Sequence, residues 1–227
     1  KWGDCDTYLE MIRRIAYKDG KAGKLLSKGV KKMAAEIGKG ADAYAIHVKG
    51  KEIAAHDPRG DKARAYSYAL GTCGGDHHEG ASTKGLVITA VVNSLCLCTF
   101  TTGLIWGGES AKITTGMLNP LCGWNMTESD YWDTGKRILA LERVFNVREG
   151  ISRKDDRLPK RLMTEKLPAG PKKGAVFSEE DTKKMQDEFF NFVGWDEKGI
   201  PSEATLKALG LEYLIDDVAA ARKEYKL

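Results

Sequence analysis

Apolar side chains recur at helical spacing along much of the chain. In residues 26–37 they fall at i, i+4, i+7 and i+11, which is the pattern of one face of an α-helix. The four residues are Leu26, Val30, Met33 and Ile37. Glycines at positions 38 and 40 predict that this helix ends there. A similar stripe predicts a last amphipathic helix over residues 214–225.

Three capping-box pairs predict where other helices begin, because a hydroxyl residue followed three positions later by an acid can satisfy free backbone N–H groups. The pairs are Thr7 with Glu10, Thr127 with Asp130, and Ser178 with Asp181. The helix after Thr127 is expected to reach about residue 147. We interpret its apolar stripe, and that of each other helix, as core packing. The stripe in question is Ile138, Leu141 and Phe145.

The longest uncharged stretch runs from Gly85 to Gly108. Its length alone would allow a membrane span. Asn93, Ser94 and several threonines interrupt it, so a helix buried in the protein interior is the better interpretation.

Strand patterns are scarce. Only residues 45–54 alternate well enough to predict a short β pair. Residues 150–177 are polar, irregular and rich in proline, and we expect them to wrap over a surface or over a partner segment. The predicted fold class is therefore mainly α.

Composition narrows the class of protein further. The 227 residues suffice for one large domain or two small ones, and a net charge of +4 spread along the chain gives no electrostatic case for nucleic acid. Five cysteines make an odd number, which favours reduced cytoplasmic thiols or metal ligands over a disulfide framework. The chain begins at Lys1 without a methionine or a signal-peptide pattern, so we expect it to be a piece of a longer protein.

Two segments contain residues that could perform chemistry. Cys96 and Cys98 are either two small buried hydrophobes or include one ligand of an iron–sulfur cluster completed elsewhere. The glycine-rich stretch from Leu70 to Gly80 is either a solvated turn or a loop whose histidines, His77 and His78, transfer protons. The residue types alone leave both questions open.

Two further segments have simpler interpretations. The run from Asp57 to Gly60 predicts a turn in which Asp57 caps the following helix. The charged stretch from Asn146 to Leu162 is expected to be a solvated or salt-bridged surface.

Taken in order, these segments resemble the C-terminal part of the aldehyde:ferredoxin oxidoreductase family of tungsten–pterin enzymes. The similarity extends over essentially the whole chain. The matching segments are Trp2, 15–17, 27–30, 48–50, 57–60, 146–150, 155–162, 167–171 and 194–201. The resemblance implies a multi-helical fold with residues 1–46 as the remainder of a middle domain and residues 47–227 as a C-terminal domain.

The resemblance also implies which residues form the site. Asn93 to Cys98 aligns with the family's second Asp-x-x-Gly-Leu-Cys motif, so Asn93, Leu97 and Cys98 would bind the pterin and Cys98 would be the fourth ligand of a [4Fe–4S] cluster. Two substitutions depart from that motif, since Asn93 replaces the aspartate and Cys96 the glycine. The other three cluster cysteines would lie upstream of this chain.

A second family motif, Arg-Gly-Ala-Asp-His, aligns with residues 73–77. This alignment makes His77 the residue that donates or accepts a proton near tungsten. Cys73 stands where the family has arginine, and His78 is an additional titratable group.

The implied activity is oxidation of aldehydes to carboxylic acids at a tungsten or molybdenum bis-pterin, with electrons passed through the [4Fe–4S] cluster to ferredoxin. The implied partners are the upstream part of the same subunit, ferredoxin or a ferredoxin-like subunit, and a small-molecule substrate. No nucleic acid or membrane span is expected, and an oligomer is allowed.

Two alternatives stay open. The departures from the family motifs fit a branch that reduces the aromatic ring of an aryl-coenzyme A thioester, as benzoyl-CoA reductase does. The chain could also be a non-catalytic helical fragment that binds a partner.

Overall fold

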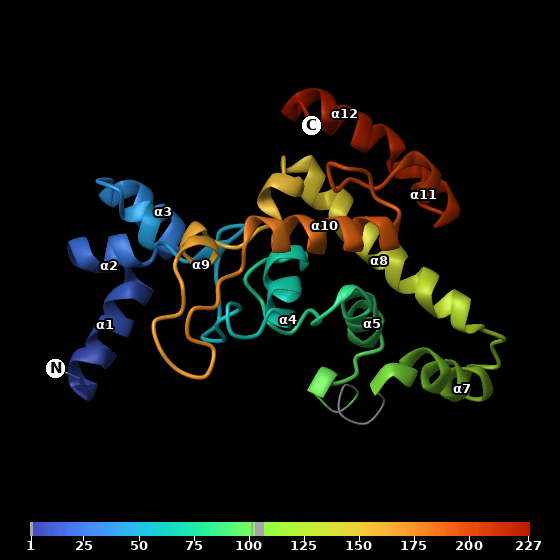
Figure 1. The fold of residues 1–227 in the computed structure, drawn as a ribbon, viewed down its shortest axis with the longest axis horizontal. Helices are drawn as coiled ribbons and strands as arrows, with labels where there is room; N and C mark the ends of the chain where they lie inside the picture. The colour runs from blue at the N-terminus through green and yellow to red at the C-terminus, as the bar shows by residue number, and fades with distance from the viewer. Residues whose placement is uncertain (1, 101, 103–106) are drawn as a thin grey trace.

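The computed structural model describes residues 2–100, 102 and 107–227, and the prediction of a mainly α fold is confirmed. Helices form nearly all of its regular structure, and the described strands form one two-stranded sheet (Figure 1). The larger helices are α1 (Cys5–Tyr17), α2 (Gly20–Leu26), α3 (Gly29–Ile37), α5 (Thr83–Ser94), α7 (Ser110–Cys122), α8 (Glu128–Arg148), α10 (Glu179–Val193), α11 (Glu203–Ala208) and α12 (Ile215–Tyr225). The shorter ones are α4 (Ala63–Ala65), α9 (Lys160–Thr164), the π-helical turn Tyr66–Leu70, and the 3₁₀ turns Ala41–Tyr44, Gly107–Glu109, Arg153–Asp155 and Glu212–Leu214.

The N-terminal helices correct two predictions. Asp4, not Thr7, is the N-cap of α1, and its carboxylate accepts the backbone N–H of Thr7. The single helix expected over residues 26–37 is wrong, because α2 ends at Leu26 and α3 begins at Gly29, which has a φ of +75°. A left-handed residue cannot continue an α-helix. The stripe through Leu26 and Ile37 therefore does not form one buried face.

The short β pair is confirmed. β1 (His47–Val48) and β2 (Lys51–Glu52) are antiparallel, with Val48 opposite Lys51. Lys49 and Gly50 form the turn with φ values of +53° and +93°. Two consecutive residues with positive φ are what a tight hairpin turn with the right-handed twist of its strands requires.

The uncharged stretch forms a shorter helix than expected. Ser82 caps α5, and the helix ends at Ser94 rather than continuing toward Gly108. Residues 101 and 103–106 of the predicted helix lie outside the described residues. The part that does form is largely buried, and it packs against α8 (Figure 1). Cys96 and Cys98 follow the helix and are exposed, so their interpretation as buried hydrophobes is wrong.

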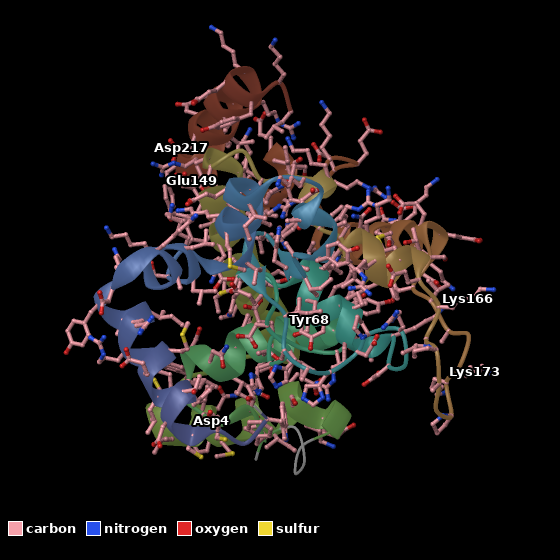
Figure 2. The ribbon with its side chains drawn as sticks, turned by 90° about the vertical axis from the view of Figure 1, so that its left-hand side faces the viewer. Asp4, Tyr68, Glu149, Lys166, Lys173 and Asp217 are labelled. Carbon is pink, nitrogen blue, oxygen red and sulfur yellow. The ribbon has the colours of Figure 1, made fainter. Side chains whose placement is uncertain are left out.

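Helices α8 and α10 begin at the predicted capping boxes. Thr127 with Asp130, and Ser178 with Asp181, each form both reciprocal hydrogen bonds. The largest core cluster joins α5, α8 and α10 with the segment around Tyr68. Tyr68 is fully buried near the middle of Figure 2, and its hydroxyl donates to the carbonyl oxygens of Ala54 and His56 at 3.2 and 3.1 Å.

Residues 150–177 are more ordered than predicted. They contain α9 and contribute Leu158, Leu162, Met163 and Phe177 to the core. The loop after α9, which contains Lys166 and Lys173, extends to the edge of the molecule (Figure 2). It does cover a surface, because the guanidinium of Arg59 donates to the carbonyl oxygen of Glu165 at 2.8 Å.

Two charged groups differ from their predicted settings. Asp57 does not cap a helix, since its carboxylate accepts the N–H and guanidinium of Arg59 within the same turn. Asp156 lies in the stretch expected at the surface, yet its side chain is only 1 % exposed and is paired with Arg143 and Lys49. A buried carboxylate is tolerated when cations and hydrogen bonds surround it.

Candidate functional site

The glycine-rich loop after Leu70 lies against the β1–β2 hairpin. Gly74 and Gly75 have φ values of +66° and +62°. A Cβ atom at Gly74 would lie 2.6 Å from the carbonyl oxygen of Val48, and one at Gly75 would lie 2.6 Å from that of Lys51. These glycines are thus required for close approach to the hairpin backbone rather than to a ligand.

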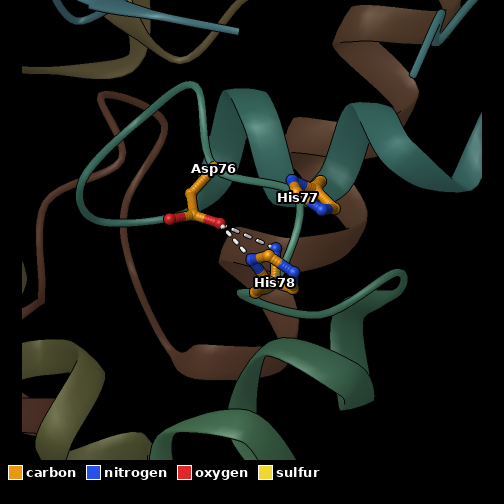
Figure 3. A group of neighbouring side chains, drawn as sticks. All are labelled: Asp76, His77 and His78. Carbon is orange, nitrogen blue, oxygen red and sulfur yellow. Dashed lines mark hydrogen bonds and ion pairs between the residues drawn. The ribbon is translucent and has the colours of Figure 1, made fainter. Parts of the chain in front are cut away.

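The loop presents Asp76, His77 and His78 together (Figure 3). Oδ1 of Asp76 accepts the backbone N–H of His78 at 2.9 Å and lies 3.2 Å from its Nδ1. The ring centroids of the two histidines are 3.7 Å apart, and the His56 ring lies 4.8 Å from that of His77. Oδ2 of Asp76 pairs with the ammonium of Lys51 at 3.0 Å.

This arrangement keeps His77 neutral. Burial lowers the pKa of His77, and the nearby rings of His78 and His56 lower it further. A neutral imidazole has one nitrogen that can accept a proton and one that can donate. The site therefore contains a proton acceptor at neutral pH, with His78 held beside it by Asp76.

The same three residues offer ligand atoms within 4.8 Å of one another, and theirs is the one such group in the described part of the chain. Two cations already lie beside it. Lys51 pairs with Asp76, and the guanidinium of Arg64 donates to the carbonyl oxygen of His77 at 3.2 Å. The positive charges of Lys51 and Arg64 would repel a divalent cation bound beside them. The group is therefore better suited to accepting and donating protons than to holding such a cation.

The segment after α5 exposes the second set of predicted site residues. The N–H of Cys96 donates to the carbonyl oxygen of Asn93, and that of Leu97 to Val92, which together make a Schellman motif. This ending turns the chain away from the helix axis. Leu97 is 37 % exposed, and Cys98 is exposed as well.

The fold brings the two segments together. The Phe100 ring, two residues after Cys98, meets the His78 ring edge-on at a centroid distance of 5.4 Å. Asn93 and Cys73 line one cavity of about 630 Å³ between α5 and α8. Its lining is completed by Thr72, Glu79, Leu86, Thr89, Ala90, Ser94, Ile138, Leu139, Leu141, Glu142, Val144, Phe145, Arg148 and Leu214.

The interpretation of the α8 stripe as core is wrong for Leu141 and Phe145, whereas Ile138 does pack against the main core cluster. Leu141 is 46 % exposed and Phe145 is 65 % exposed, and both line the cavity together with Ile138. The fully buried residues of α8 include Tyr131, Leu139 and Val144, and of these Leu139 and Val144 also reach the cavity.

The carboxylates of Glu79 and Glu142 both line the cavity, and the sequence analysis did not identify Glu142. Burial raises the pKa of Glu142, as does the charge of Glu79, although the hydroxyl of Thr72 donates to Glu142 at 2.7 Å. An acid on the same helical face as Ile138 and Phe145 was the available signal. Burial and the neighbouring Glu79 raise the pKa of Cys73 to about 11, so Cys73 is a neutral thiol at physiological pH.

The described residues fit part of the ligand set for the cofactors that the family motifs imply. None of the five cysteines is in a disulfide, and the described residues hold no group of cysteines that could bind a cluster alone. An exposed thiol at Cys98 is suited to be one ligand among others.

Among the described residues, no helix is both long and apolar enough to cross a membrane.

Comparison with known proteins identifies similar sequences over the whole chain. The family model described as aldehyde ferredoxin oxidoreductase, domains 2 and 3, matches residues 1–211. The tungsten-containing aldehyde ferredoxin oxidoreductase of Pyrococcus horikoshii is 33 % identical over 93 % of this chain. The aliphatic sulfonate oxidoreductase, WOR-like subunit, of Pyrococcus furiosus is 34 % identical over 100 % of it. The chain spans 38 % of the length of each of these relatives.

A solved structure has a similar fold. The active-site complex BamBC of benzoyl-coenzyme A reductase, in complex with 1,5-dienoyl-CoA, matches with a TM-score of 0.61 over 97 % of this chain and 40 % of that one. The sequence identity is 21 %, so this similarity concerns the fold alone.

Proposed function

The chain belongs to the aldehyde ferredoxin oxidoreductase family, and on that basis we propose that it is the C-terminal portion of a tungsten–pterin oxidoreductase subunit. The complete subunit oxidises aldehydes to carboxylic acids and passes electrons to ferredoxin. It carries a tungsten or molybdenum bis-pterin and a [4Fe–4S] cluster, both shared with the rest of the subunit. The observation that supports this most is that the His77 loop and the segment after α5 meet, through His78 and Phe100.

When bound, these cofactors supply the oxidation of the substrate and the one-electron transfers. Cys98 provides one thiolate to the cluster from an exposed position just beyond the helix end. Leu97 supplies an exposed apolar side chain for the pterin, and Asn93 supplies an amide from the cavity wall. An amide both donates and accepts but carries no charge, so its hydrogen bonds are weaker than those of the aspartate in the family motif.

His77 transfers the proton that is released or taken up when the substrate reacts. Its neutral ring accepts a proton at an imidazole nitrogen, and the protonated ring can later return it. Nδ1 of His78 faces Asp76, which leaves Nε2 of His78 as a second site for a proton.

We also propose the division into residues 1–46 and 47–227. In its support, α1 to α3 bury only Gly23 and Ala34, whereas the main core cluster begins at Val48. Five cysteines without a disulfide fit a reducing compartment, and we place the protein in the cytoplasm.

The decisive experiment measures metal content and turnover in the complete subunit purified without oxygen. We expect tungsten and iron by mass spectrometry of the elements, and aldehyde-dependent reduction of a viologen dye. Cys98→Ser should abolish the electron paramagnetic resonance signal of the reduced cluster, whereas Cys122→Ser, an exposed cysteine at the end of α7, should leave it unchanged. A subunit that contains neither tungsten nor iron would refute the proposed enzyme. An unaltered signal in Cys98→Ser would refute Cys98 as a ligand of the cluster.

The role of His77 is tested separately. His77→Asn should lower kcat by about 10²–10⁴-fold, the usual contribution of a positioned acid or base. His78→Gln should have a much smaller effect. Since the neutral ring is active and its pKa is lowered, activity should fall on acidification only below the ordinary value of 6.5. Full turnover in His77→Asn would contradict the proton-transfer role.

The similarity to benzoyl-CoA reductase concerns the fold alone, so it does not favour an aryl-CoA substrate. Assays of the same preparation with benzaldehyde and with benzoyl-CoA separate the two reactions.

A further inference from the structure

Lys49 occupies a position that turn chemistry does not explain. Its φ of +53° belongs to the left-handed region, where a hairpin turn favours Asn, Asp or Gly. Its side chain is only 2 % exposed, and lysine is almost never fully buried unless it is paired. A strained backbone conformation together with a buried charge suggests that the ammonium group of Lys49 has a specific role.

The ammonium of Lys49 binds three oxygens. It donates to the carbonyl oxygen of Ala69 at 2.6 Å and to that of Gly71 at 3.0 Å, and it lies 2.8 Å from Oδ1 of Asp156. An ammonium group has three donors, so all of them are used. Ala69 and Gly71 flank the end of the π-helical turn, where the glycine-rich loop begins.

Asp156 anchors this ammonium to the core. Its carboxylate also accepts both Nη atoms of Arg143, at 3.0 and 2.7 Å, and Nε of Arg143 donates to the carbonyl oxygen of Gly199 at 2.7 Å. The carboxylate thus has two cationic partners. Removal of either one leaves Asp156 paired with the other.

The same hairpin contacts the loop at further points. Gly74 approaches the carbonyl oxygen of Val48, and Lys51 pairs with Asp76, which in turn holds His78. The hairpin therefore contacts the loop at its beginning, in its middle and directly before His77.

From these contacts we propose that Lys49 is a positioning residue for His77, whose ammonium fixes the start of the loop relative to the buried Asp156. This inference rests on the proposed function only in that His77 transfers the proton. Arg143 shares the carboxylate of Asp156 but does not contact the loop carbonyls, so it serves as the matched control.

The test compares Lys49→Met with Arg143→Met in the complete subunit. Each change removes one of the two cations beside Asp156, but only Lys49→Met frees the carbonyl oxygens of Ala69 and Gly71. We expect Lys49→Met to lower kcat by about 100-fold at unchanged metal content, the effect of a small misplacement of a catalytic group. Arg143→Met should lower the melting temperature and keep kcat within twofold of the wild type.

A second measurement does not depend on activity. Diethyl pyrocarbonate acylates accessible imidazoles, and peptide mass spectrometry resolves His77 from His78 and His47. We expect the labelling rate of His77 to change severalfold in Lys49→Met, while that of His47 stays the same. If Arg143→Met does not fold, Lys62→Met, which removes an exposed lysine paired with Asp181, replaces it as the control.

The outcomes separate the two proposals. Wild-type kcat or wild-type labelling of His77 in folded Lys49→Met would overturn the positioning role, even if His77→Asn is inactive. Full activity in His77→Asn would instead refute the proton-transfer role, and the labelling comparison would still test whether Lys49 positions the loop.

Discussion

Cys96 occupies a backbone position that favours glycine. It is the left-handed residue of the Schellman motif that ends α5, with a φ of +57°. In that conformation the Cβ of an L-residue crowds the following carbonyl oxygen. A glycine, which the family motif that residues 93–98 resemble has at this position, would adopt the same conformation without that strain.

Cys96→Gly should consequently stabilise the protein. Relief of the left-handed strain outweighs the greater freedom that glycine gives the unfolded chain, for a net gain of about 0.5–1 kcal/mol. Urea denaturation measures the change. Cys122→Gly, the same substitution at the last residue of α7, should instead destabilise by up to about 1 kcal/mol because that residue is helical. A loss of stability in Cys96→Gly would contradict the argument.

At the scale of elements, the packing of α5 against α8 depends on one missing side chain. A Cβ atom on Gly135 of α8 would lie 2.5 Å from Cγ1 of Val87 and 2.7 Å from its carbonyl oxygen. Neither separation is compatible with van der Waals radii, and the oxygen belongs to the backbone. The two helices that form the cavity wall are therefore held at a spacing that only glycine permits.

Gly135→Ala should destabilise the protein by about 1–3 kcal/mol, the usual cost of overpacking. The matched control is Gly116→Ala in α7, where a Cβ would meet no atom within 4 Å. There the better helix propensity of alanine should stabilise by about 0.5–1 kcal/mol. Thermal melts of both variants give the sign directly, and a stabilised Gly135→Ala would show that the helices can move apart freely.

At the scale of the whole molecule, Asp156 connects the hairpin, α8 and the segment after α8. Burial alone would raise the pKa of Asp156, but the charges of Arg143 and Lys49 outweigh it and hold the pKa below its ordinary value of 3.8. The carboxylate therefore stabilises the fold fully at pH values above the pKa that Asp156 has in the unfolded chain. This contribution is lost as the pH falls through the lower pKa of the folded state.

Asp156→Asn should cost about 3–5 kcal/mol at pH 7, because it leaves two buried cations without their counter-ion. Urea denaturation at pH 7 and near pH 3 should show a smaller difference from the wild type at the lower pH. Asp133→Asn, an exposed aspartate of α8, should change stability by less than about 0.5 kcal/mol. Equal stability of Asp156→Asn and the wild type at pH 7 would refute the role of this network.

The sequence by itself determined the features that depend on neighbouring residues. The capping boxes at Thr127 and Ser178 and the hairpin around Lys49 were predictable because each is made by residues a few positions apart. The family motifs identified His77, Asn93, Leu97 and Cys98 by resemblance, and their roles stay predictions.

Only the tertiary structure decided which side chains are buried and which segments meet. Leu141 and Phe145 have the spacing of a core stripe yet line a cavity, and Asp156 has the charge of a surface residue yet is buried. Periodicity gives the faces of a helix but not what covers each face, and a charge can be buried only where distant residues supply its partners. The meeting of His78 with Phe100 likewise follows from the packing of a loop against the end of α5, which no local pattern records.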